Sequence, residues 1–445
     1  MQKKIPVYKE KGWTGQGFEL VKNPLDFMVQ QTRLLGNFFK VPFFFRKVYV
    51  TTNLDVIRHV LQVNHKKYKK SPAYKQLKLA LGNGLVTSEG AFWRQQRRMA
   101  QPAFYKTQLH ELFNKMTAVA EDFCEQLEAK RGQKTSFDIA PEMMQVTSDI
   151  VLKALFSTFR QQDKNEMAKT MYFAQEHIMR RTIKPWTIPF GYLNGREKRF
   201  RNAMEDFNKT LYDLIDERTN KPDPPTDLLT MLVQARDEET GLGMTKQQLR
   251  DEAITMYSAG HETSANALNW ILMILSKEPE IVAKMRAEIQ EVLGDRTPGF
   301  DDLRRLEYVR QVIEEGMRLY PPAYAVGREA MEADEILGYA IPKGAIVLMS
   351  IYALHHDPAY YPNPEKFDPG RFSAEAVNSR PRLAYMPFGA GPRMCIGNHF
   401  AMMEMQLLLT LLIRRFDFIL DEKYPVIPQG LVTMKPMTGI RMWVR

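Results

Sequence analysis

The chain has 445 residues, of which 44% are hydrophobic and 26% charged, a composition typical of a globular protein with a large core. It excludes disordered and low-complexity chains. Two cysteines exclude a disulfide-rich scaffold and a cysteine-rich zinc module. The net charge of +10 raises the possibility that the protein binds nucleic acid. However, the basic clusters are short and dispersed, and no nucleic-acid-binding motif accompanies them. We therefore expect no nucleic-acid binding.

The N-terminal region contains no apolar run of signal-peptide length. The most apolar neighbourhood, Leu34 to Phe45, is interrupted by Gly, Asn, Lys and Pro and is too short to span a bilayer. We expect no transmembrane anchor and a location that is cytoplasmic or peripheral at a membrane. Further on, Val48 to Thr52 is β-rich and Leu54 to Val63 has a helical pattern.

Helical periodicity dominates the middle of the chain. The side chains of Phe113, Met116, Ala120, Phe123 and Leu127 share one helical face, and this predicts that the neighbouring Cys124 is a buried structural thiol. Two segments interrupt the pattern. Thr182 to Leu193 is apolar and aromatic, and is either a contact for a ligand or lipid or a tucked-in surface loop. Lys221 to Pro225 is either a domain linker or a loop between helices, and the unchanged composition favours the loop.

A long buried helix is predicted from about Thr245 to Ser276, because its second half is apolar almost all round. A polar interruption, Ala259-Gly260-His261-Glu262-Thr263, lies inside it. The Thr263 hydroxyl can bond a carbonyl one turn earlier and open the helix locally. A carboxylate beside a hydroxyl in a buried groove suits proton delivery. The alternative is a helix kink with a solvated Glu262.

The C-terminal part predicts a strand at Ala345 to Ser350, and then a glycine-rich loop from Pro387 to Gly397 that precedes a helix at Phe400 to Phe416. Cys395 stands at the start of that helix, where free N–H groups and the helix dipole favour a thiolate. Arg393, two residues away, can pair with an anion. A thiolate in such a loop, with no second Cys or His beside it, suits a single axial bond to a metal.

Four motifs together resemble those of the cytochrome P-450 family. Phe388 to Gly397 matches Phe-x-x-Gly-x-Arg-x-Cys-x-Gly, the haem-binding loop of that family, and Ala259 to Thr263 resembles its oxygen-activating helix motif. Trp93 and Arg97 resemble its Trp-x-x-x-Arg pair. Three more residues resemble its structural triad, in which a Glu-x-x-Arg helix meets a second arginine, namely Glu315, Arg318 and Arg371.

The resemblance implies a mainly α fold with a smaller β-rich lobe, in which one large domain, residues 1–445, encloses haem b. We expect the β-rich lobe at about residues 1–70, the helical core at about residues 71–445, and no fused reductase. Cys395 would ligate the haem iron as a thiolate, and Glu262 and Thr263 would deliver protons. The other residues expected to contact the cofactor are Trp93, Arg97, Ala259, Arg328, Phe388, Arg393 and Gly397.

The implied activity is insertion of one oxygen atom of O2 into a lipophilic substrate, by hydroxylation or epoxidation, with a fatty acid or terpenoid favoured. The residues expected to line the substrate site are Tyr74, Leu85, Ala259, Ala323 and Tyr324. Electrons would pass from NAD(P)H through a separate ferredoxin or flavodoxin-type protein to a monomeric enzyme. The basic clusters at Arg94, Arg97, Arg98, Arg414 and Arg415 are either the face that binds this donor or a solvated basic face. The alternatives are a peroxide-driven peroxygenase, a haem-thiolate isomerase and a haem-based sensor.

Overall fold

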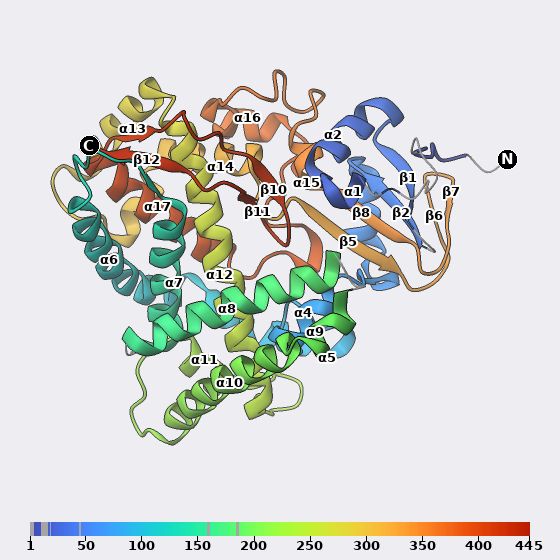
Figure 1. The fold of residues 1–445 in the computed structure, drawn as a ribbon, viewed down its shortest axis with the longest axis horizontal. Helices are drawn as coiled ribbons and strands as arrows, with labels where there is room; N and C mark the ends of the chain where they lie inside the picture. The colour runs from blue at the N-terminus through green and yellow to red at the C-terminus, as the bar shows by residue number, and fades with distance from the viewer. Residues whose placement is uncertain (1–3, 10–16, 18, 44–45, 158–160, 184–186) are drawn as a thin grey trace.

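The computed structural model describes residues 4–9, 17, 19–43, 46–157, 161–183 and 187–445. One single domain has a β-rich part beside the N-terminus and a larger helical part that contains the C-terminus (Figure 1). The mainly α fold with a smaller β lobe is thus confirmed. Within the described residues, no helix is both long enough and apolar enough to cross a bilayer.

The β lobe is built on a five-stranded sheet with the order β1-β2-β8-β5-β3. Its strands are β1 (Phe38–Phe43), β2 (Arg46–Thr51), β3 (Tyr68–Lys70), β5 (Ala325–Ala330) and β8 (Ile346–Ser350). β2 and β8 pair in parallel with Val48 opposite Ile346, and the other pairs are antiparallel. The expected extent of the β lobe, residues 1–70, is therefore too small, because two of the five strands come from residues 325–350. Both predicted β runs are adjacent in this sheet.

The predicted helical segment at residues 54–63 begins as α3 (Leu54–Arg58) and continues as a π-helical turn, η1 (His59–Val63). The Asn53 side chain caps α3 by accepting the backbone N–H groups of Asp55 and Val56. The π turn was not predicted, since the periodicity of five residues cannot distinguish it from an α turn.

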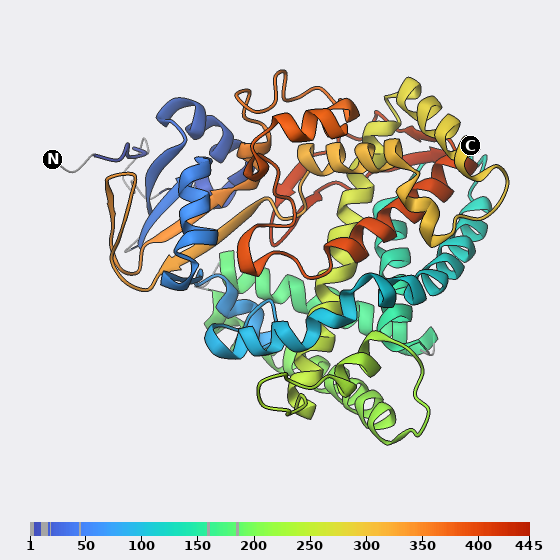
Figure 2. The ribbon, with the colours of Figure 1, turned by 180° about the vertical axis from the view of Figure 1, so that it is seen from behind.

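The long central helix, α12 (Lys246–Leu275), runs through the middle of the molecule (Figures 1 and 2). It matches the predicted span because a capping box defines its start, with the Thr245 hydroxyl accepting the Gln248 N–H and the Gln248 side chain accepting the Thr245 N–H. Its middle and second half pack against α7 (Ala140–Phe156), α14 (Glu307–Leu319) and α17 (Asn398–Arg415).

The other helices surround this centre. Cys124 lies in α6 (Lys106–Glu128) and is buried, as predicted. The segment at residues 221–225 is a loop between α10 (Arg196–Asn220) and α11 (Leu228–Gln234), also as predicted. The remaining α-helices are α1 (Glu19–Lys22), α2 (Pro24–Leu35), α4 (Tyr74–Leu81), α5 (Gly90–Ala100), α6 (Lys106–Glu128), α8 (Gln161–Ile183), α9 (Ile188–Leu193), α10 (Arg196–Asn220), α11 (Leu228–Gln234), α13 (Pro279–Leu293), α15 (Ile351–His355) and α16 (Ala374–Ser379).

Short elements complete the described fold. The small sheets comprise β4 (Phe137–Asp138), β12 (Arg441–Val444) and β9 (Phe418–Leu420), then β10 (Pro428–Gly430) with β11 (Met434–Pro436), and β6 (Asp334–Ile336) with β7 (Tyr339–Ile341). The 3-10 turns are η2 (His65–Lys67), η3 (Gln101–Phe104), η5 (Phe300–Arg304), η6 (Pro369–Phe372), η7 (Arg382–Ala384) and η8 (Gly391–Arg393).

Candidate active site

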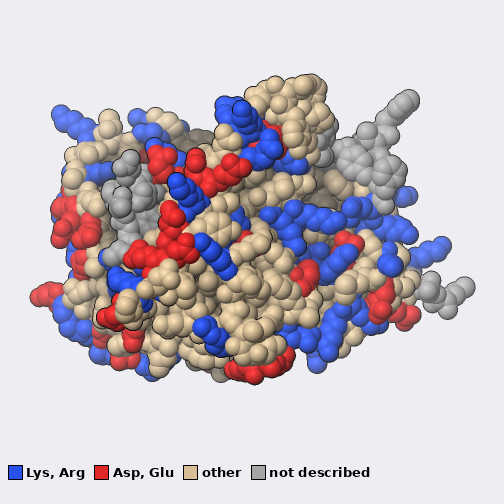
Figure 3. Space-filling model, turned by 90° about the horizontal axis from the view of Figure 1, so that it is seen from below, with Lys and Arg blue, Asp and Glu red and all other residues tan. Residues whose placement is uncertain are grey.

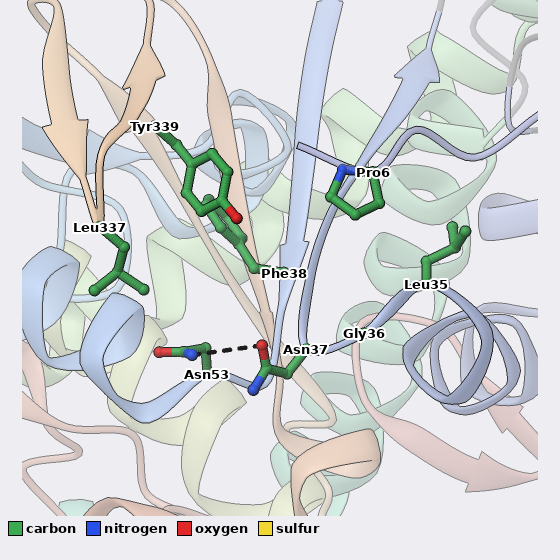
Figure 4. A pocket seen from close by; sticks show the side chains of 8 residues that line it. All are labelled: Pro6, Leu35, Gly36, Asn37, Phe38, Asn53, Leu337 and Tyr339. Atoms are coloured by element: carbon green, nitrogen blue, oxygen red, sulfur yellow. Dashed lines mark hydrogen bonds between the residues drawn. The ribbon is translucent and has the colours of Figure 1, made fainter. Parts of the chain in front are cut away.

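A cavity of about 370 Å³ lies between the middle of α12, helix α5, the edge of the β lobe and the loop that precedes α17. Most of its wall is apolar, and Cys395 faces it. A second cavity, of about 560 Å³, lies among the N-terminal segment, α2 and the hairpin of β6 and β7 (Figure 4). Among the described residues, its lining carries no acid, base or thiol apart from the Tyr339 phenol, so the first cavity is the candidate site.

Cys395 is held by the backbone of its own loop. Its N–H donates to the Phe388 carbonyl at 2.9 Å, and α17 begins three residues later. The thiol is accessible from the cavity and surrounded by protein elsewhere, and this burial raises its pKa. The Gly397 N–H and the Arg97 guanidinium act in the opposite direction and lower the pKa. These groups would stabilise a thiolate, which is the form that ligates a metal.

Gly391 explains the shape of this loop. Its φ is +74°, and a Cβ there would overlap the Leu61 carbonyl oxygen of the π turn η1. Gly389 also has a φ of +74°, but a Cβ on it would have open space. The loop therefore lies directly against the β lobe at Gly391, where only glycine fits.

Four cationic side chains line the cavity where it meets α5 and the β lobe, namely Lys70, Arg97, Arg328 and Arg393. The Arg97 Nη1 donates to the Met394 carbonyl at 2.9 Å. Burial lowers the pKa of both Arg97 and Arg393, and burial together with Arg393 and Arg328 lowers that of Lys70 to about 7. Cations this close together repel one another, so an anionic ligand bound among them would relieve that repulsion.

Trp93 belongs to the same end of the cavity. The Arg393 guanidinium lies 4.1 Å from the centre of its ring, and also bonds the Ser88 carbonyl and the Glu89 carboxylate. A thiol on an apolar wall and cations at one end fit haem b, which is flat and apolar except for its iron and its two propionates. The residues present thus match the cofactor that the sequence predicts.

The α12 wall presents Ala259, Gly260, Thr263 and Ser264 to the cavity. The Thr263 hydroxyl donates to the Ala259 carbonyl at 2.8 Å, the backward bond that the sequence predicts. A Cβ on Gly260 would approach Val151 of α7 to 3.1 Å, so the glycine also lets these two helices pack closely.

Two predicted residues do not line the cavity. The Glu262 carboxylate accepts hydrogen bonds from Gln175 of α8 at 2.8 Å and from Thr433 at 2.9 Å, and burial raises its pKa. It therefore does not form a pair with the Thr263 hydroxyl. The Tyr324 hydroxyl donates to the Leu431 carbonyl at 2.9 Å. Of the expected substrate-lining residues, those that do line the cavity are Tyr74, Leu85, Ala259 and Ala323.

The three predicted triad residues meet in the core. The fully buried Arg318 bonds both carboxylate oxygens of Glu315, at 2.7 and 2.8 Å. The Arg371 Nε lies 3.5 Å from the same carboxylate. Arg318 also donates to the His355 carbonyl at 2.8 Å, while the Asp368 N–H donates to Glu315 at 2.9 Å. The triad thus ties α14 to the segments at residues 355 and 366–371.

Among the polar residues that sequence reasoning missed are two ionisable side chains near the cavity. Lys70 lines it, and the only sequence signal was the basic run at residues 66–70. Glu404 of α17 is fully buried, and burial raises its pKa to about 8. The Ser264 hydroxyl lies near Glu404 but outside hydrogen-bond geometry. A carboxylate in the apolar face of a predicted helix was the available signal for Glu404.

The Thr182 to Leu193 segment is only partly described. Residues 184–186 lie outside the described residues, and the rest is the end of α8 and the short helix α9. Phe190 and Leu193 of α9 are 63% and 84% exposed, so this part is not tucked in.

Comparisons with known proteins agree with this geometry. The family model for cytochrome P450 matches residues 6–440. Cyclooctatin synthase of Streptomyces melanosporofaciens is 34% identical over 431 residues, which cover 96% of this chain and 93% of that protein. Cyclooctat-9-en-7-ol 5-monooxygenase of the same organism is 31% identical and covers 90% and 86% of the two chains. Human cytochrome P450 4V2 is also 31% identical, covering 89% and 79%.

Solved structures agree as well. The crystal structure of the cytochrome P450DA heme domain superimposes with a TM-score of 0.90 and 26% sequence identity, covering all of this chain and 98% of that one. Family model, relatives and fold together show that this chain belongs to the cytochrome P450 family of haem-dependent monooxygenases, which use O2.

Proposed function

We propose that this protein binds haem b with Cys395 as the axial thiolate ligand and inserts one oxygen atom into a lipophilic substrate. The observation that carries this proposal is the Cys395 thiol on the wall of an apolar cavity that has cations at one end. Arg97, Arg393, Arg328 and Lys70 would bind the propionates. When bound, haem supplies the activation of O2.

The protein's own groups bind and orient the substrate and move protons. Thr263 places its hydroxyl at the cavity wall and would hold a proton there. Glu262 faces α8, away from the cavity, so in this arrangement a proton from its carboxyl would need a water between it and Thr263. Ala259 and Gly260 carry little or no side chain and leave space beside them for a substrate.

The central test is the spectrum of the reduced protein with carbon monoxide. Cys395→Ala should lose the thiolate-type shift, whereas Cys124→Ala should keep it, since Cys124 lies buried in α6. A normal shift in Cys395→Ala would refute the assignment.

The substrate we propose is a lipophilic compound such as a fatty acid or a terpenoid. The support is the apolar lining, which includes Leu85, Val86, Met256 and Val326. The name of one relative also gives an alcohol, cyclooctat-9-en-7-ol, as its substrate. A screen of haem spin-state shifts with fatty acids, terpenoid alcohols, steroids and macrolides tests this, and a response to polar compounds alone would contradict it.

We propose that electrons from NAD(P)H arrive through a separate acidic protein of the ferredoxin or flavodoxin type. Arg94 on α5 and Arg414 on α17 are two of the basic residues that we assign to its binding face. Arg98 and Arg415 already pair with Asp237 and Glu121, so they contribute less. Reversal of charge at Arg94 and Arg414 should raise the KM for the donor several-fold, unlike reversal at Lys209 of α10.

We propose that the protein is a monomer, which sedimentation would test, and that it lies in the cytoplasm or peripherally at a membrane. Figure 3 looks onto the face of α8, α9 and α10, where uncharged surface adjoins Lys and Arg side chains as well as Asp and Glu side chains. The exposed Phe190, Tyr192 and Leu193 of α9 belong to this face and suit the surface of an anionic bilayer. Co-sedimentation with anionic vesicles should therefore weaken in Leu193→Asp.

A further inference from the structure

The segment Gly82–Glu89, called here the 82–89 segment, joins α4 to α5 and crosses α12 beside the cavity. Two of its side chains, Leu85 and Val86, form part of the cavity wall. The Thr87 hydroxyl folds back to the Gly82 carbonyl at 2.7 Å. The position of this segment relative to α12 therefore sets the shape of the cavity.

Two neighbouring carboxylates of α12 hold the segment by its backbone. Asp251 accepts the Asn83 N–H at 2.8 Å, and Glu252 accepts the Leu85 N–H at 3.1 Å. Between these two hydrogen bonds, Gly84 of the segment lies in close contact with α12. A Cβ on Gly84 would overlap the Thr255 hydroxyl and lie 2.5 Å from the Asp251 carbonyl oxygen. The segment thus lies flush on α12 where Leu85 enters the cavity.

Leu85 is held from the other side as well. The Lys70 ammonium donates to the Leu85 carbonyl and to the Ser88 carbonyl, both at 2.9 Å. Glu252 and Lys70 therefore hold the N–H and the carbonyl of one residue. Their opposite charges also interact, because Lys70 lowers the pKa of Glu252 against the larger effect of burial, which raises it to about 7.

The burial of the Glu252 carboxylate is unfavourable for the stability of the fold. Its side chain is fully buried, and among the described residues its Oε1 has no hydrogen-bond partner. Burial of a carboxylate with one oxygen unsatisfied destabilises a fold. Within the described part of the chain, the Leu85 N–H is the one hydrogen-bond donor to this carboxylate. The structural effect of Glu252 is therefore to position Leu85.

We propose that Glu252 is a positioning residue for the substrate, because its hold on the Leu85 N–H sets where Leu85 and Val86 stand in the cavity wall. This inference rests on the proposed function, in which the substrate lies between that wall and the haem. A shift of the 82–89 segment then changes which part of a large ligand reaches the iron, while a small ligand is unaffected.

The experiment compares Glu252→Leu, which removes the acceptor, with Glu252→Gln, which keeps one. In the haem-loaded protein, amide exchange of a peptide that spans residues 82–89 should be about ten-fold faster in Glu252→Leu. The ratio of dissociation constants for 4-phenylimidazole and imidazole should change about five-fold. Glu252→Gln should stay close to the original protein in both. Glu252→Asp, whose shorter side chain withdraws from Leu85, gives the same test if the leucine variant does not fold.

Glu288→Leu is the matched control, because Glu288 of α13 likewise accepts backbone N–H groups, those of Tyr308 and Val309, at a place that does not line the cavity. It should leave the azole ratio unchanged. Faster exchange in Glu252→Leu with an unchanged ratio would overturn the proposal and leave a structural role. Failure of the proposed function would look different, since no azole would then shift the haem spectrum of the original protein.

Discussion

The buried pair of Glu315 and Arg318 allows a prediction of stability from its contacts. Arg318→Met keeps most of the side-chain volume but removes the two bonds to the carboxylate and the bond to the His355 carbonyl. Glu315 then retains only the Asp368 N–H and the more distant Arg371. A buried charge that loses its main partner costs about 3–5 kcal/mol, a large share of a total stability of about 5–15 kcal/mol.

Glu315→Gln should cost less, about 1–3 kcal/mol, because Arg318 loses its counter-charge but keeps the amide oxygen and the carbonyls of His355 and Lys366 as acceptors. The pKa of Glu315 supports this ranking. Burial raises that pKa although both arginines lower it, so the buried carboxylate is unfavourable even when it is paired. Thermal and urea unfolding, followed by circular dichroism and by haem absorbance, would rank the two variants. The reasoning fails if Arg318→Met is as stable as the original protein, or more stable than Glu315→Gln.

Three further predictions concern the cavity. Gly391→Ala should lower the unfolding midpoint and haem retention more than Gly389→Ala does. An alanine at either position has about 1–2 kcal/mol of backbone strain, but only the alanine at residue 391 overlaps the Leu61 carbonyl. Equal losses in the two variants would contradict this. Thr263→Ala should release peroxide and consume more NAD(P)H per product, and tight coupling in that variant would remove Thr263 from proton delivery. The pKa of Glu404, raised to about 8 by burial, makes the folded state hold a proton that the unfolded state has released. Stability should therefore fall as pH rises from about 4.5 to 8, whereas Glu404→Gln should show a flatter profile; parallel profiles would argue against this burial effect.

Local signals predicted the central helix and the cysteine loop well. The ends of α12 agree with the prediction to one residue, because the capping box at Thr245 is a local device. The glycines near Cys395 predicted the loop there. Gly391, which has no room for a Cβ, lies at a fixed position of the motif, whereas Gly389, which has such room, does not.

Properties that arise between distant segments could not be predicted. Glu262 bonds Gln175 and Thr433, which lie far from it in the chain, so its sequence neighbourhood did not show that its carboxylate lies apart from the cavity and from Thr263. Lys70 and Glu252 meet at Leu85 from segments that are far apart in the chain. No local pattern indicates such a meeting.

The parallel pairing of β2 with β8 has a consequence for synthesis of the protein. About 300 residues separate the two strands, so at roughly 5–20 residues per second a ribosome needs about 15–60 s to complete the partner of β2. During that time the strand has its neighbour β1 on one side and an unpaired, apolar edge on the other. Nascent chains that stop before β8, which begins at Ile346, should therefore depend on chaperones. The β lobe, against which Gly391 lies, becomes complete only late in translation.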